Sequence, residues 1–128
     1  MIETKIFHQN PLIILHKILA FSDEQATIIG VRNAVKVVEN ALIDRKSFDL
    51  LIDLSETVDE SNYKLSAHKI WAEGFKENAA IKDRIRKTAV VANDSPKFRT
   101  EKEYMEDRTH KWFTDFQMAL DWLKSHDN

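Results

Sequence analysis

The sequence predicts a single α/β domain, residues 1–128, built on a mixed five-stranded sheet with four parallel strands, an antiparallel N-terminal strand and four helices. Two observations predict this class. Short apolar runs, typical of buried strands, alternate with longer segments whose apolar residues recur at helical spacing. Parallel strands also need crossover connections, which the intervening helices supply.

The N-terminal third predicts a hairpin and then a long helix. Residues 2–8, "IETKIFH", alternate weakly, whereas residues 11–19, "PLIILHKIL", are apolar on both faces in their first half. The short joint "HQNP" between them favours an antiparallel pair. Ser22, followed three residues later by Gln25, is typical of a capping box and predicts a helix that runs to about Arg45.

The rest of the chain alternates between strand and helix. The segments predicted as buried strands are 49–54, 86–92 and 110–113, and those predicted as helices are 63–80, 96–107 and the C-terminal residues from 115. Ser95 is the predicted cap of its helix, with Pro96 in the first turn, where the missing N–H has no cost. Thr114 with Gln117 forms a second capping box.

Composition excludes several classes of function. The chain has no cysteine, which excludes disulfides, thiolate nucleophiles and cysteine-based zinc sites. Its net charge is −2 with acids and bases interleaved, which disfavours nucleic acid as a partner. No pair of histidines has helical metal-site spacing, so we expect no metal and no cofactor. The N-terminus lacks a secretory pattern, and the apolar run 11–21 is too short to span a bilayer. We therefore expect a cytoplasmic protein, with peripheral membrane contact as an added role.

Three stretches carry a resemblance to a known family. They are "FDLLIDLSE" (48–56), "IRKTAVVANDSPKF" (85–98) and "KWFTDFQMALDWLKS" (111–125). In order and spacing they resemble the SpoIIAA-like family of small bacterial proteins, whose fold is close to STAS domains (sulfate transporter and anti-sigma-factor antagonist) and to CRAL-TRIO lipid-binding domains. The resemblance implies this fold and no established enzymatic activity. It also implies two candidate roles, binding of hydrophobic ligands with membrane association and regulated protein–protein contact.

The main functional prediction is a non-enzymatic binding protein for a small hydrophobic or lipid-like ligand. Trp71 and Phe75 are four residues apart and share a helix face, which suits either the cover of a pocket at the carboxyl edge of the sheet or a membrane surface. Gly74 is then a hinge, or else a position of close helix packing with both rings in the core. The predicted lining is Leu54, Ile70, Trp71, Phe75, Trp112 and Phe113, with Asp53, Ser55, Asn93 and Asp94 at the mouth.

The alternative is a regulatory partner-binding module, phospho-switched at Ser61. In anti-sigma-factor antagonists, a strand like "LLIDL" leads to a motif Asp-Ser-Ser-Gly at a helix start, and phosphorylation there breaks partner binding. The matching place reads Asp59-Glu60-Ser61-Asn62, so Ser61 falls on the phosphoacceptor while two other motif positions differ. A simpler interpretation is that Asp59 or Ser61 caps the following helix.

Other interpretations of the same residues are weaker. Asp53, Glu56 and Asp59 would serve for acid–base catalysis, but acids between a strand and a helix are typically caps. A receiver-type phosphoacceptor at Asp53 needs an acidic pair after the first strand, where "HKILAF" is oily and basic. His16, inside an oily strand, is interpreted as a core histidine with satisfied hydrogen bonds. Exposed apolar residues on an outer helix would support a homodimer.

Overall fold

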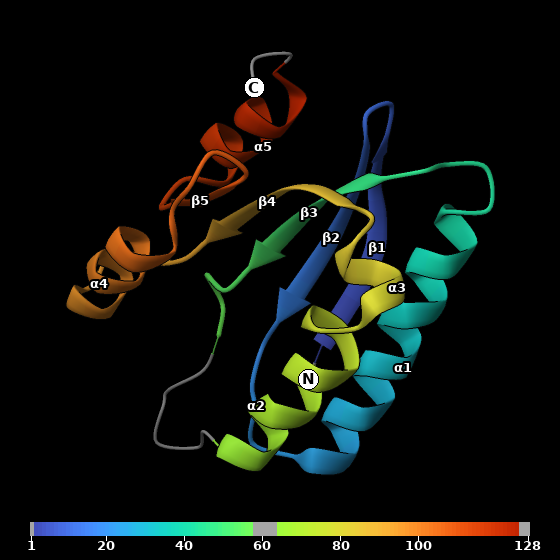
Figure 1. Cartoon of the computed structure of the whole chain (residues 1–128). Coiled ribbons are helices and arrows are strands. Elements are labelled where there is room, and N and C mark those ends of the chain that lie inside the picture. Colours follow the sequence, from blue (N-terminus) through green and yellow to red (C-terminus); the bar gives the residue numbers. More distant parts are fainter. Residues whose placement is uncertain (1, 58–63, 126–128) are drawn as a thin grey trace.

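The computed structural model describes residues 2–57 and 64–125, and within them it contains one five-stranded sheet (Figure 1). The strand order β1-β2-β3-β4-β5 follows the chain order. β1 pairs antiparallel with β2, and the other three pairs are parallel, which confirms the predicted mixed sheet. The strands are β1 (Ile2–Gln9), β2 (Leu12–Ile18), β3 (Phe48–Asp53), β4 (Ile85–Val91) and β5 (His110–Phe113).

In the described part of the chain, the segment predicted as one helix, 63–80, is divided into α2, η2 and α3. The Glu77 N–H bonds the Ala72 carbonyl, five residues back, at 2.7 Å, so the chain continues from α2 into a π-helical turn, η2. The Asn78 side chain then caps a separate short helix, α3, by accepting from the Ala80 N–H. The helices are α1 (Glu24–Ala41), α2 (Leu65–Trp71), η2 (Ala72–Lys76), α3 (Ala79–Lys82), α4 (Pro96–Met105) and α5 (Phe116–Lys124).

Two predicted helix caps lie one residue too early. Asp23, not Ser22, caps α1, and its carboxylate accepts from two backbone N–H groups at 2.9 and 3.2 Å. Asp115, not Thr114, caps α5 in the same way. In both places an acid stands next to the hydroxyl residue, and a negative charge at a helix N-terminus is favourable. The predicted cap Ser95 is confirmed, since its hydroxyl accepts from the backbone of α4.

The cap predicted for the helix that carries Trp71 is wrong. That helix begins at Leu65, with Lys64 in the cap position and no side-chain cap bond. Asp59 and Ser61 therefore do not occupy the cap position, and both lie outside the described residues.

The sheet buries a different core on each face. Alternation along β2 sends Ile14 and His16 to one face and Ile13 and Leu15 to the other. Buried side chains of α1, α2, η2, α3 and α4 cover the first face. Figure 1 shows α1, α2 and α3 on this side of the sheet. On the second face the buried cluster takes its helical residues from α5 alone, namely Ala119, Leu120 and Leu123.

Two basic residues of β4 fasten α5 to the sheet. Lys87 is only 3% exposed, and its ammonium donates to the carbonyl oxygens of Trp122 and Ser125, both at 3.1 Å. Arg86 donates to Leu123 O at 3.3 Å and pairs through two nitrogens with the buried carboxylate of Asp49. These bonds satisfy carbonyls that the end of a helix leaves open.

Gly74 lets η2 approach α1 closely. A Cβ atom added at Gly74 would lie 2.8 Å from Cγ1 of Val31, closer than atoms in contact allow. Val31 is β-branched and buried, so it has little freedom to move away. This contact supports the interpretation of Gly74 as a packing position and not as a hinge.

We expect Gly74→Ala to destabilise the protein although alanine favours helix formation by about 1 kcal/mol. Overpacking against Val31 costs about 1–3 kcal/mol and outweighs that gain. The measurement is urea unfolding of Gly74→Ala, Val31→Ala and the double variant. In the Val31→Ala background the added methyl group has room, so Gly74→Ala should be neutral or stabilising. An equal loss in both backgrounds would contradict the packing role.

Candidate functional site

The predicted polar groups at the carboxyl end of the sheet form a hydrogen-bonded network. One carboxylate oxygen of Asp53 accepts from the Ser55 N–H at 2.9 Å and from the Ser55 hydroxyl at 2.6 Å. The Asn93 side chain donates to Ser55 O at 3.0 Å, which joins the loops after β3 and β4. The structure thus brings Asp53, Ser55 and Asn93 together. Asp94 lies apart from this network and pairs with Arg99 of α4 at 3.2 Å.

The start of the loop after β3 is tied to both neighbouring strands. The Leu54 N–H donates to Val91 O, and the Thr57 hydroxyl donates to Ile18 O, both at 2.7 Å. Glu56 forms an ion pair with Lys17 of β2, and the hydrogen bond between them raises the pKa of Lys17. The carboxylate of Asp53 therefore braces the start of the loop after β3.

Beneath α2, the imidazole of His16 occupies the space in which a ligand was predicted. Its Nε2 accepts from the indole N–H of Trp71 at 2.9 Å. An indole can only donate, so the proton of His16 stands on Nδ1, which donates to the Thr4 hydroxyl at 2.9 Å. The ring also stacks on Phe75, with centroids 4.2 Å apart and planes inclined by 1°. The interpretation of His16 as a satisfied core histidine is confirmed.

Burial keeps His16 neutral at physiological pH. The side chain is fully buried, and desolvation lowers its pKa from 6.5 to about 3. Its two hydrogen bonds persist for as long as the ring is neutral. The group therefore acts as a fixed polar joint between β1, β2 and α2.

The other residues of the predicted ligand lining do not share one pocket. Trp112 and Phe113 are consecutive in β5, so they point to opposite faces of the sheet. Trp112 packs on Phe98 of α4, and Phe113 packs on Trp122 of α5. Trp71 and Phe75 belong to the first core, with Leu54 at its margin, and Ile70 is half-buried on α2.

Two hollows in the described part of the chain lie away from this lining. One, of about 220 Å³, has Arg45, Lys46 and Arg86 in its wall, and the other, of about 260 Å³, lies beside Arg86 and Arg108. Both are at the amino end of the parallel strands. Ligand binding beneath α2 thus stays a prediction without support from the packing.

A small apolar surface lies where the start of α2 meets the chain after β2, since the Lys64 N–H donates to Phe21 O at 2.7 Å. The ring of Phe21 contacts those of His68 and Trp71, with centroids 5.2 and 5.6 Å apart. Leu65, one turn before His68, is 74% exposed. Burial lowers the pKa of His68, and the nearby ammonium groups of Lys76 and Lys97 lower it further. We call Phe21, Leu65 and His68 the α2 surface.

Sequence reasoning missed Phe21 as part of this surface. The available signal was its position, since it stands between the end of β2 and the cap of α1, where an apolar residue packs on its surroundings. Within residues 2–57 and 64–125, no group of three or more acidic or histidine side chains is placed to hold a metal ion. No helix of that part is long and apolar enough to cross a membrane.

Comparison with solved structures confirms the SpoIIAA-like fold. The chain is similar to an uncharacterised protein of the DUF3478 family with a SpoIIAA-like fold from Shewanella loihica PV-4. The two share 19% identity with a TM-score of 0.57, and the match covers 96% of this chain and 92% of that one. No family model matches the sequence, and no curated protein is significantly similar to it. At this identity the likeness establishes the fold alone, and it lends no support to CRAL-TRIO character, lipid binding or membrane association.

We expect the free energy of unfolding to fall as pH drops from about 6.5 towards 3. In this range His16 is protonated in the unfolded chain but stays neutral in the folded chain. The slope from this group reaches about 1.4 kcal/mol per pH unit. Urea unfolding at a series of pH values measures it. His16→Gln keeps a donor and an acceptor but does not titrate, so its slope between pH 6.5 and 4.5 should be shallower. Identical slopes would show that His16 is not the group responsible.

Trp71 and Trp112 are similarly buried, but of these two only the indole of Trp71 donates a hydrogen bond to a described residue, which is His16. Trp71 and Trp112 are 7% and 6% exposed, and the indole nitrogen of Trp112 has no hydrogen-bond partner among the described residues. Trp71→Phe leaves Nε2 of His16 unpaired, whereas Trp112→Phe removes an unpaired donor. We expect Trp71→Phe to cost about 1–3 kcal/mol more free energy of unfolding than Trp112→Phe. Equal costs would contradict a structural role for the bond.

Proposed function

We propose that this protein is a non-enzymatic regulatory module that binds a protein partner through the α2 surface. The SpoIIAA-like fold supports this role, because regulated protein–protein contact is the role implied by the STAS resemblance. The observation that carries it is the 74% exposed Leu65 at the start of α2, one helical turn before His68, whose ring contacts that of Phe21. An exposed apolar side chain next to partly buried rings is typical of the centre of a protein interface.

The packing beneath α2 favours binding of a protein partner on the surface over binding of a small-molecule ligand inside. His16, Trp71 and Phe75 fill the interior beneath α2, so the surface offers contact from outside. The network of Asp53 and Asn93 holds the start of the adjoining loop against the sheet. A rigid support of this kind lowers the cost of ordering an interface on binding.

We further propose that phosphorylation of Ser61 switches the contact. Ser61 lies outside the described residues, but it is four positions before Leu65 in the sequence. A phosphate adds a charge of about −1.5 to −2 close to an apolar contact and so opposes its burial. The effect on the partner would be release.

Paired substitutions at opposite ends of the sheet test the docking surface. Leu65 and Ile43 are 74% and 77% exposed, so neither change to glutamate disturbs the core. Tagged chains are cross-linked in cells of the native host, and the partners are identified by mass spectrometry. We expect a partner that wild type and Ile43→Glu retain and that Leu65→Glu loses. A partner set unchanged by Leu65→Glu, or lost equally in both variants, would refute the proposal.

The switch has its own readout. Ser61→Asp should release the partner defined above, and Ser61→Ala should retain it. Intact mass of the chain from its host should show a phosphorylated fraction that Ser61→Ala abolishes. Retention of the partner by Ser61→Asp would rule out the switch and leave the docking surface standing.

A further inference from the structure

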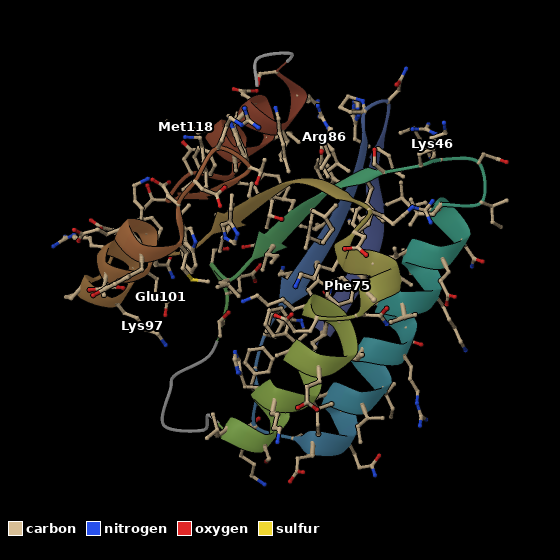
Figure 2. The ribbon with its side chains drawn as sticks, in the orientation of Figure 1. Lys46, Phe75, Arg86, Lys97, Glu101 and Met118 are labelled. Carbon is tan, nitrogen blue, oxygen red and sulfur yellow. The ribbon has the colours of Figure 1, made fainter. Side chains whose placement is uncertain are left out.

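The amino end of the parallel strands carries two adjacent hollows with cationic walls. Their volumes are about 220 and 260 Å³, and Arg86 borders both. Arg45 and Lys46 line the first, and Lys87 and Arg108 line the second. Figure 2 shows Lys46, on the loop after α1, and Arg86, on β4, at this same end of the sheet.

The charge of these walls contrasts with the charge of the chain. The whole chain has a net charge of −2, yet the lining holds five cations and a single carboxylate, that of Asp49. Both oxygens of Asp49 accept from Arg86, at 2.9 and 2.7 Å. Asp107, near the second hollow, accepts from the backbone and hydroxyl of Thr109. The carboxylates of Asp49 and Asp107 therefore already have hydrogen-bond donors.

Part of the positive charge has a structural purpose. The ammonium of Lys87 is committed to carbonyls at the end of α5, and one nitrogen of Arg45 donates to Gln9 O at 2.6 Å. Such bonds neutralise the negative ends of helices and loops. They do not account for the side chains of Lys46 and Arg108, which are exposed. The Lys46 carbonyl accepts from Arg84 at 2.6 Å, but among the described residues neither the Lys46 ammonium nor the Arg108 guanidinium has a hydrogen-bond or ion-pair partner. The structural bonds also leave Nη1 of Arg86 without a hydrogen bond to those residues.

We propose that this end of the sheet binds a small phosphorylated compound, with Lys46, Arg86 and Arg108 as donors to the phosphoryl oxygens. Each hollow is smaller than the roughly 300–1,000 Å³ of pockets that enclose a whole drug-sized ligand, so each suits a single group. The guanidinium of Arg108 can pair with phosphoryl oxygens through two parallel hydrogen bonds, whereas Arg86 offers Nη1 alone because Asp49 holds its other two nitrogens. Because Arg86 lines both hollows, a ligand with two phosphoryl groups fits better than one with a single group.

This site is independent of the proposed partner contact, since Leu65 and the loops around Asp53 lie at the opposite end of the sheet (Figure 1). Loss of one activity is therefore not expected to remove the other. Substitution of Lys46 or Arg108 does not disturb the core, because both side chains are exposed. Arg86 is unsuitable as a test position, because its removal would leave the buried Asp49 unpaired.

The test is a titration of the ¹⁵N-labelled chain with inorganic pyrophosphate, inorganic phosphate and citrate at physiological ionic strength. We expect saturable shifts of the amides around Lys46, Arg86 and Arg108, with pyrophosphate binding tighter than either other anion. Lys46→Ala and Arg108→Ala should each weaken pyrophosphate binding by about fivefold or more, since each removes a charged donor. The matched controls Lys36→Ala and Arg32→Ala, exposed on α1, should leave it unchanged.

Three outcomes would overturn the proposal. They are the lack of saturable binding, an equal loss in the α1 controls, and citrate binding as tightly as pyrophosphate. Co-sedimentation with phosphatidylcholine vesicles containing phosphatidic acid identifies the source of the phosphoryl group. Binding to these vesicles that Lys46→Ala and Arg108→Ala both weaken assigns it to a lipid headgroup. Without such binding, the pyrophosphate result assigns it to a soluble compound.

Discussion

The chain of hydrogen bonds from Thr4 through His16 to Trp71 is the constraint on which the first core depends. It joins β1, β2 and α2 through one imidazole, and the direction of the indole N–H fixes which ring nitrogen carries the proton. With both nitrogens bonded, a polar group can lie fully buried without a desolvation penalty left over. The imidazole ring also stacks on Phe75, so the core beneath α2 is closely packed.

Most of the fold could be predicted because its signals are local. The oily runs at β3 and β4, the short β1–β2 joint and the cap at Ser95 each depend on neighbours in sequence. The prediction of a ligand pocket beneath α2 depended on contacts between residues far apart in the sequence. His16 and Trp71 are 55 positions apart, so no local pattern shows that the His16 ring fills the space beneath Trp71. Strand alternation alone would have placed Trp112 and Phe113 on opposite faces.

The two ends of the sheet differ in character for a topological reason. In a parallel arrangement the helices that follow the strands end near the amino end, where their open carbonyls draw cations such as Lys87. The loops near Asp53 leave from the carboxyl end and need side chains that fold back on their own backbone. An apolar surface and a cationic one thus lie at opposite ends of one small sheet.

The reliance of the second core on α5 has a consequence during synthesis. Strands that neighbour each other in the chain also pair, so the sheet can assemble progressively as the chain leaves the ribosome. The apolar side chains of Ile13 and Leu51 nevertheless stay uncovered until the segment Phe116–Lys124, which follows the last strand, has emerged. Until then, one apolar face of the sheet is exposed to solvent. An exposed apolar face of this kind is where chaperones bind, and a chain that ends before this segment is prone to aggregate.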